Sequence, residues 1–184
     1  IVVLPVPLEK TVSYGKGTSK GPEEILKASH YVEFYDEEQK RELCFEKGIC
    51  TLEAMNLQKL SIEKALQKIH KEVAKHIDEG KFVVTLGGEH SLSAAPIMAF
   101  HERFPNLSIL QIDAHSDLRN SYEGSKYSHA CVMARVAEFN SNIVQVGIRA
   151  QCIEELEIKK NKGIKTFYAR EIKMGMYGEN WHEL

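Results

Sequence analysis

The sequence predicts an α/β protein with three layers, α/β/α, in which helices cover both faces of a mostly parallel sheet. Two observations favour this class. Between residues 82 and 168, short apolar runs typical of buried strands alternate with helical patterns, and this alternation is typical of parallel sheets. Two consecutive runs also end in polar residues, as expected where a parallel sheet binds ligands at the carboxyl ends of its strands. We expect one domain over residues 1–184.

The amino-terminal part predicts a strand, a glycine-rich loop and a helix. Residues 1–6 form an apolar run, and the loop at residues 14–22 ends in Pro22. Proline suits the first turn of a helix because the N–H that it lacks has no helical partner there. A phosphate-binding loop is one interpretation, but Lys20 stands where the dinucleotide pattern requires its third glycine. We favour an active-site loop or a plain turn.

Residues 61–80 predict the clearest helix of the chain, and Ser61 suits its amino-terminal cap. Its apolar residues recur at helical spacing, at positions Ile62, Leu66, Ile69, Val73 and Ile77. Residues 32–35 and 49–52 are weak strand candidates, and the charged run at residues 36–42 predicts a solvated surface.

A regular alternation follows this helix. Strands are predicted at residues 82–86, 107–113, 143–148 and 164–168. Helices are predicted at about residues 93–103, 129–139 and 153–160. Strands that alternate with helices in this way indicate a parallel sheet with helices on both faces.

Composition excludes several classes of protein. The chain has 184 residues, enough for one domain with a sizeable core, and its net charge of -2 argues against nucleic-acid binding. The four cysteines form no Cys-x-x-Cys pair, so we expect neither a structural zinc site nor a disulfide framework. This cysteine usage suits a protein of the reducing cytoplasm, which is the location that we expect. No apolar run is long enough to span a membrane, and the first residues lack a basic leader. We expect neither a membrane nor a nucleic acid as partner.

Candidate metal ligands stand at the ends of two consecutive strands. Asp113, His115 and Asp117 follow one strand at alternate positions, so their side chains can converge on one side of the extended chain. His90 follows the preceding strand. Two carboxylates with imidazole suit Mn²⁺ or a similar divalent ion. The four side chains can satisfy one metal, or begin a two-metal site in which Asp113 bridges the pair.

His129 is the candidate for proton transfer. It lies in the segment that follows the ligand strand and begins the next predicted helix. An imidazole there can carry a proton to a leaving group. The spacing fits equally well a histidine that only begins the helix.

Three motifs resemble the ureohydrolase family, which includes arginase, agmatinase, guanidinobutyrase and formimidoylglutamase. They are Gly-Gly-Glu-His-Ser at residues 87–91, Asp-Ala-His-Ser-Asp at 113–117 and Tyr-Ser-His-Ala at 127–130. The early Gly-Thr-x-x-Gly-Pro at residues 17–22 is similar as well. The segment Tyr-Ser-His-Ala-Cys-Val at residues 127–132 most resembles the agmatinases.

The resemblance implies an arginase-like fold and a binuclear manganese site. His90 and Asp117 would bind one Mn²⁺, His115 the other, and Asp113 both; His129 corresponds to the proton-shuttling histidine. The implied reaction is hydrolysis of a small cationic guanidino compound by a metal-activated hydroxide, most simply agmatine to putrescine and urea. The resemblance also implies a homo-oligomer, a trimer or a hexamer.

One motif of that family is missing from the sequence. The resemblance implies a second aspartate pair, Asp-x-Asp, on a later strand, but no aspartate follows Asp117. We therefore expect the domain to be truncated before this motif, with its C-terminal part missing. In the chain as printed we expect both metals to bind weakly, because the number of ligands sets the affinity.

Other functions stay open at this point. Arginase, guanidinobutyrase or formimidoylglutamase activity would use a related substrate at the same site. A metal-dependent deacylase is a further alternative, which one bound zinc would distinguish from two manganese ions. A non-catalytic or fragmentary homologue that acts as a binding subunit is the alternative from a different class.

Overall fold

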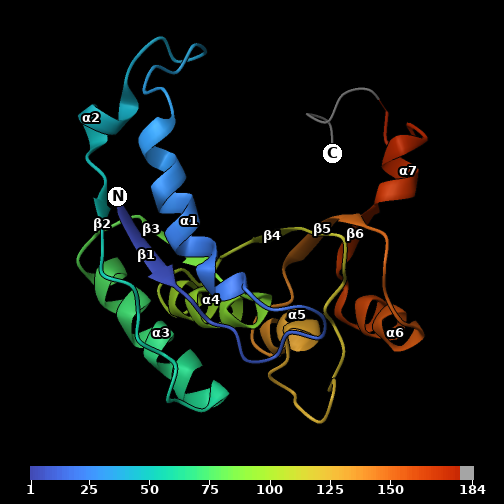
Figure 1. Cartoon of the computed structure of the whole chain (residues 1–184). Helices are drawn as coiled ribbons and strands as arrows, with labels where there is room; N and C mark the ends of the chain where they lie inside the picture. Colours follow the sequence, from blue (N-terminus) through green and yellow to red (C-terminus); the bar gives the residue numbers. More distant parts are fainter. Residues whose placement is uncertain (179–184) are drawn as a thin grey trace. The chain divides into compact units, whose positions relative to one another are not determined.

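Parallel strands form the centre of both halves of the chain. The computed structural model describes residues 1–178 and divides into two units, Ile1–Phe100 and His101–Leu184. Figure 1 shows the course of the chain through both units. Each unit holds one three-stranded sheet in which every pair of neighbouring strands is parallel. The mostly parallel α/β class predicted from the sequence is confirmed.

The first unit has the sheet order β2-β1-β3. Its strands are β1 (Val2–Val6), β2 (Cys50–Thr51) and β3 (Val83–Gly87). Its α-helices are α1 (Gly21–Ala28), α2 (Leu43–Lys47), α3 (Ile62–Asp78) and α4 (Ala94–His101), the last of which ends one residue into the second unit. Short 3-10 helices are η1 (Thr18–Lys20), η2 (Ser29–Tyr31) and η3 (His90–Ser93).

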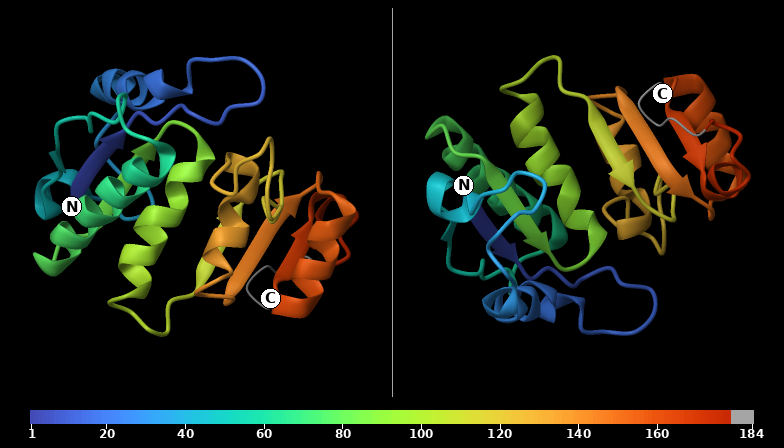
Figure 2. Two further views of the ribbon diagram at one scale, coloured as in Figure 1. Left: turned by 90° about the horizontal axis from the view of Figure 1, so that it is seen from below. Right: turned by 90° about the horizontal axis from the view of Figure 1, so that it is seen from above.

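The core of the first unit lies between its sheet and two helices. Alternate residues of β1, Leu4 and Val6, are buried on one face, as the two-residue period of a strand requires. They belong to one apolar cluster with Ile69 and Val73 of α3 and Ala99 of α4. Figure 2 shows α3 and α4 side by side over β1 and β3. The expected cap of α3 is confirmed, because Ser61 Oγ accepts the N–H of Lys64 at 3.3 Å.

The second unit has the sheet order β4-β5-β6. Its strands are β4 (Ile109–Ile112), β5 (Ile143–Ile148) and β6 (Lys165–Tyr168). Its helices are η4 (His129–Cys131), α5 (Val132–Val136), α6 (Ile153–Lys162) and α7 (Ala169–Lys173). Figure 1 shows α5 and α6 on one side of this sheet and α7 on the other, as in a three-layer arrangement.

Two predicted elements differ from the structure. Residues 32–35 form no strand; they are exposed, and Phe34 packs edge-on against Phe45 instead of pairing with the sheet. The helix predicted at 129–139 is shorter. It opens with a 3-10 turn, and α5 ends at Val136. Among the described residues, no helix combines the length and the apolar character needed to cross a bilayer.

Candidate metal centre

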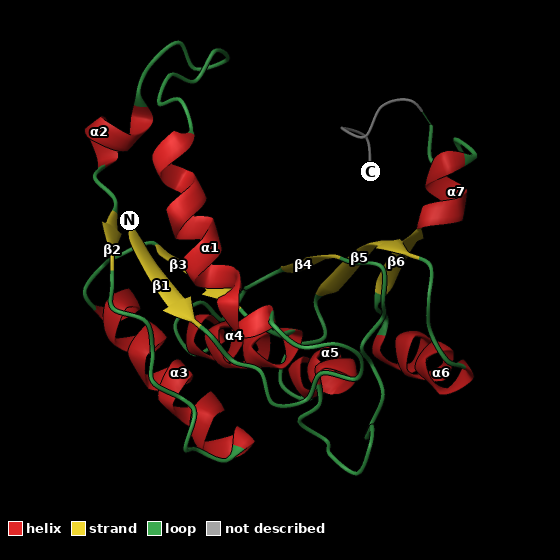
Figure 3. Ribbon diagram, in the orientation of Figure 1, coloured by secondary structure: helices red, strands yellow, loops and turns green. Residues whose placement is uncertain are grey.

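The loop after β4 carries three of the four predicted ligands. Residues 113–128 contain neither helix nor strand, and Figure 3 draws the connection between β4 and α5 as loop. The first part of the loop still follows the neighbouring strand, because the N–H of Asp113 donates to Val146 O at 3.0 Å and that of Arg149 to Ala114 O at 2.8 Å. The backbone at Asp113 is therefore hydrogen-bonded to β5 in the same way as the strand before it.

A glycine opposite Asp113 permits this close pairing. Gly147 adopts a φ of +88°, and a Cβ atom there would lie 3.2 Å from Asp113 O. A side chain would be strained by the backbone conformation and crowded by the carbonyl. The glycine thus lets β5 pass close to the first ligand.

Asp117 is held in an unusual backbone conformation. Its φ is +52°, a value that aspartate tolerates better than most residues. Its carbonyl oxygen accepts the N–H groups of Met133 at 2.9 Å and Ala134 at 3.2 Å, which explains where α5 begins. The side chain is buried, with 8% of the residue exposed. Such local strain persists only where the surroundings determine it, and it is common at functional sites.

Within the second unit, the structure brings the two predicted carboxylates together. One oxygen of Asp113 and one of Asp117 lie within 4.8 Å of each other. His115 lies beside Asp113: its backbone N–H donates to Asp113 Oδ1 at 2.9 Å, and its ring Nδ1 lies 3.6 Å from the same oxygen. Among the described residues, the ring of His115 is not part of the group of ligand atoms, including those of Asp113 and Asp117, that lie within 4.8 Å of one another. The His115 side chain is 64% exposed. Carboxylate oxygen and imidazole nitrogen are donors that fit a hard or borderline divalent cation. The structure brings the two carboxylates together, while the convergence of His115 with both of them stays a prediction.

His90 belongs to the first unit, at the start of η3 directly after β3. It lines a hollow of about 320 Å³ together with Gly88, Ser93 and other residues of the same turn. The turn is tightly packed, because a Cβ atom at Gly88 would lie 2.1 Å from Leu8 O. The backbone just before His90 is therefore packed against Leu8, which follows β1. The membership of His90 in the metal site stays a prediction.

Two carboxylates whose roles were not predicted from the sequence hold the glycine-rich loop and the segment before it. Glu89, which is 5% exposed, accepts the N–H groups of Lys10 at 2.6 Å and Thr11 at 2.8 Å, and the Thr11 hydroxyl. Glu9 accepts the N–H groups of Gly17 at 2.8 Å and Ser19 at 2.9 Å. Glu9 thus closes the loop predicted at residues 14–22, and Glu89 holds the segment that precedes it. Nothing in sequence spacing could find a contact such as that of Glu89 with Thr11, 78 residues apart.

We expect the loop contacts of Glu9 to survive far into the acid range. Hydrogen bonds from the N–H groups of Ser19 and Gly17 lower the pKa of Glu9 from 4.5 to about 2. A depressed carboxyl pKa contributes stability that is present above pH 4.5 and is lost as the pH falls towards 2. The amide proton shifts of Gly17 and Ser19 in NMR spectra should therefore change with a midpoint near pH 2. Glu9→Gln should remove this transition, whereas a midpoint near 4.5 in the unaltered protein would contradict the assignment.

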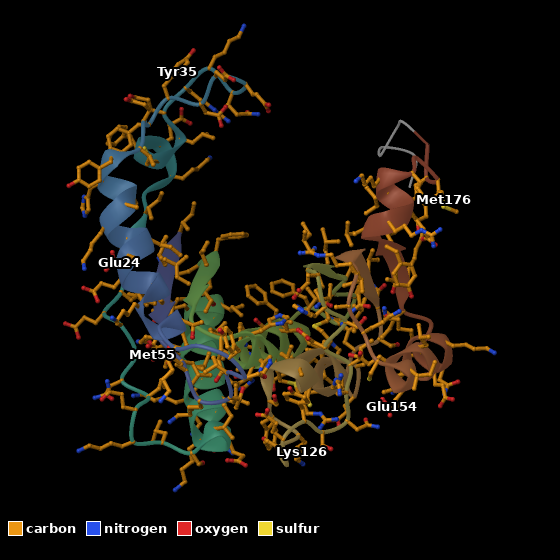
Figure 4. All side chains as sticks on the ribbon, turned by 45° about the vertical axis from the view of Figure 1, so that its right-hand side comes forward. Glu24, Tyr35, Met55, Lys126, Glu154 and Met176 are labelled. Atoms are coloured by element: carbon orange, nitrogen blue, oxygen red, sulfur yellow. The ribbon has the colours of Figure 1, made fainter. Side chains whose placement is uncertain are left out.

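His129 is the first residue of η4 and directly follows Ser128, the last residue of the loop after β4. Ser128 Oγ lies 3.3 Å from His129 Nδ1. The Tyr122 ring packs edge-on against the His129 ring, with 5.8 Å between the ring centroids. Figure 4 labels Lys126 in this loop. The ring is held by its neighbours, while the prediction that it transfers a proton stays a prediction.

The fold of this chain is arginase-like. Agmatine ureohydrolase of Thermoplasma volcanium superposes with a TM-score of 0.84 at 30% identity, covering 94% of this chain and 58% of that one. Arginase from Medicago truncatula superposes with a TM-score of 0.83 at 27% identity, covering 95% and 58%. These two structures share with this chain the parallel α/β architecture that the sequence predicts.

Sequence comparisons agree with the fold. Residues 1–181 match the family described as the arginase family, and the chain belongs to that family. N(1)-aminopropylagmatine ureohydrolase of Synechocystis is 38% identical over 177 residues, covering 94% of this chain. Agmatinase of Bacillus anthracis is 35% identical over 173 residues, covering 91%. The chain spans about 58% of the length of both relatives.

Proposed function

We propose that the full-length protein hydrolyses a small cationic guanidino compound to urea and an amine at a binuclear manganese site. The observation that carries this proposal is the pair of carboxylates on the loop after β4, Asp113 and Asp117, with oxygens within 4.8 Å of each other. Membership of the arginase family and 35–38% identity to relatives named for ureohydrolase or agmatinase activity support the reaction class.

We assign four ligands to the two cations. His90 and Asp117 would hold one, His115 would hold the other, and Asp113 would contribute to both. Bound divalent cations lower the pKa of water and so make hydroxide available at neutral pH. The carboxylates also favour a cationic substrate over an anionic one, because opposite charges attract at short range.

His129 is proposed to deliver a proton to the departing amine. An imidazole can accept and donate a proton within the neutral pH range, and departure of an amine requires protonation of its nitrogen. Ser128 on one side of the ring and Tyr122 against its face limit its rotation. A ring held in this way loses less entropy when it engages the substrate.

Agmatine is the substrate that we propose first. It combines a guanidinium group with a second cation and carries no carboxylate to repel the site. N(1)-aminopropylagmatine is the second candidate, because the relatives at 38% and 37% identity, from Synechocystis and Thermus thermophilus, are named for it. The two compounds share the guanidinium end and differ in the length of the amine tail.

A panel of substrates separates these candidates. Full-length protein loaded with Mn²⁺ should release urea from agmatine or N(1)-aminopropylagmatine at least about 100-fold faster, as kcat/KM, than from arginine or guanidinobutyrate. This preference follows from the carboxylate that both poor substrates carry. Urea from arginine or guanidinobutyrate with none from agmatine would overturn the substrate, and formamide from formimidoylglutamate would point to another member of the family. Tight binding of a single zinc ion with amide hydrolysis would indicate a deacylase instead.

A further inference from the structure

Two buried glutamine side chains connect the middle of the second sheet with the Asp113 loop. Gln111 on β4 and Gln145 on β5 are partners in the strand register, and Thr166 on β6 is the next partner across the sheet. Gln145 is 0% exposed and Gln111 is 7% exposed. Burial of an amide costs free energy unless its hydrogen bonds are satisfied. Gln111, Gln145 and Thr166, called the row below, must therefore find hydrogen-bond partners within the protein.

The row has a fixed direction of hydrogen bonding. Thr166 Oγ1 donates to Gln145 Oε1 at 3.3 Å, and Gln145 Nε2 donates to Gln111 Oε1 at 2.6 Å. Gln111 Nε2 then donates to Asp113 Oδ2 at 3.3 Å and to His115 O at 3.1 Å. A carbonyl oxygen can only accept, and so can an ionised carboxylate. The amide of Gln111 must therefore present its NH₂ group to the loop, and Gln145 must present its own NH₂ group to Gln111.

Gln145 also holds the loop directly. Its Nε2 donates to Ser116 O at 2.8 Å as well as to Gln111 Oε1, so both of its N–H groups are used. The two glutamines together bind the Asp113 carboxylate and the carbonyl oxygens of two consecutive loop residues, His115 and Ser116. Removing the Gln145 donors would leave two buried acceptors without them and free the Gln111 amide to turn.

We infer that Gln145 is a positioning residue of the metal site. Acting through Gln111, it orients the carboxylate of Asp113, and through Ser116 O it fixes the backbone between His115 and Asp117. This inference rests on the proposed function, because it assigns Asp113 to a bound cation. A packing role alone would need no amides here, since other buried residues of the same sheet, such as Ile143 and Phe167, are apolar.

The test is the affinity of full-length protein for Mn²⁺, measured by titration calorimetry at a temperature well below unfolding. Gln145→Met keeps the length of the side chain and removes its donors. We expect Mn²⁺ affinity to fall by about 10- to 100-fold, the usual cost of losing a partner of a metal ligand. The electron paramagnetic resonance spectrum of bound Mn²⁺ should change as well, because the carboxylate is reoriented. Gln111→Met should give the same loss, and it serves where Gln145→Met does not fold.

A stability control separates positioning from packing. Phe167 lies on β6 as the register partner of Val146. Phe167→Leu shortens a buried side chain of the same sheet and leaves both amides unchanged. It should lower the melting temperature and leave Mn²⁺ affinity unchanged. Gln145→Met and Gln111→Met variants that bind Mn²⁺ as tightly as the unaltered protein would overturn the inference alone. Absence of Mn²⁺ binding in the unaltered full-length protein would overturn the proposed function.

Discussion

Asp113→Asn in the full-length protein is expected to abolish urea release and to remove tight binding of Mn²⁺. The substitution keeps the shape of the side chain but replaces a charged oxygen by an NH₂ group, which cannot ligate a cation. The proposed site uses Asp113 for both cations, so loss of its charge and of one of its two oxygens weakens the binding of the pair. We expect urea release to fall by on the order of 10³-fold or more, equivalent to about 4 kcal/mol in the barrier. Steady-state assays and metal analysis of the dialysed protein measure the two effects.

Asp36→Asn is the matched control, with the same chemical change in an exposed turn of the first unit. Asp36 Oδ1 accepts the N–H of Gln39 at 2.7 Å, an exposed contact for which little energetic consequence is expected. This variant should bind Mn²⁺ and release urea as the unaltered protein does. An Asp113→Asn protein that keeps two tightly bound Mn²⁺ ions would contradict the assignment of the ligands.

The sequence predicted those parts of the fold that depend on local periodicity. Residues 143–148 alternate little and are almost wholly apolar, and β5 covers the same residues. The apolar spacing from Ile62 to Ile77 identified α3, because its stripe faces the buried core. The closeness of Asp113 and Asp117 was predictable for the same reason: their spacing is local and they follow a recognisable strand. Their role as ligands stays a prediction.

Contacts that depend on register or on distant loops were not predictable from spacing. Gln111 and Gln145 are 34 residues apart and meet only because β4 and β5 pair in one register. A signal was present nonetheless, since each is a single amide inside an apolar strand. The α-helix predicted from residue 129 begins only at Val132, where the Asp117 carbonyl accepts the N–H groups of Met133 and Ala134 in the first turn of α5. No property of the helical segment itself reveals that contact.

The prediction of manganese, like those of the substrate, the trimer or hexamer and the cytoplasm, stays a prediction. Ligand chemistry narrows the metal to hard or borderline divalent ions, because carboxylate oxygen and imidazole nitrogen suit several of them. Selectivity then depends on geometry and on metal availability rather than on ligand type alone. For this reason the substrate panel and the metal titration are independent tests of the same site.

Gly88→Ala is expected to cause the largest loss of stability in the first unit. A Cβ atom at this position would lie 2.1 Å from Leu8 O and 3.0 Å from Leu8 C. Leu8 cannot move aside, because it is 1% exposed within the core cluster and its carbonyl accepts the N–H of Glu89 at 2.9 Å. We expect the free energy of unfolding to fall by more than about 3 kcal/mol. Urea denaturation followed by circular dichroism measures it.

Gly80→Ala provides the comparison for that experiment. Gly80 has a φ of +71° and no atom within 4 Å of an added Cβ, so alanine there meets backbone strain without a steric clash. The expected cost is about 1–2 kcal/mol. Because the Gly88 clash would displace the turn that carries Glu89, the Gly88→Ala protein should also lose the contacts of Glu89 with Thr11. Faster hydrogen exchange at the Thr11 amide would report that loss, and equal destabilisation by the two alanines would refute the steric argument.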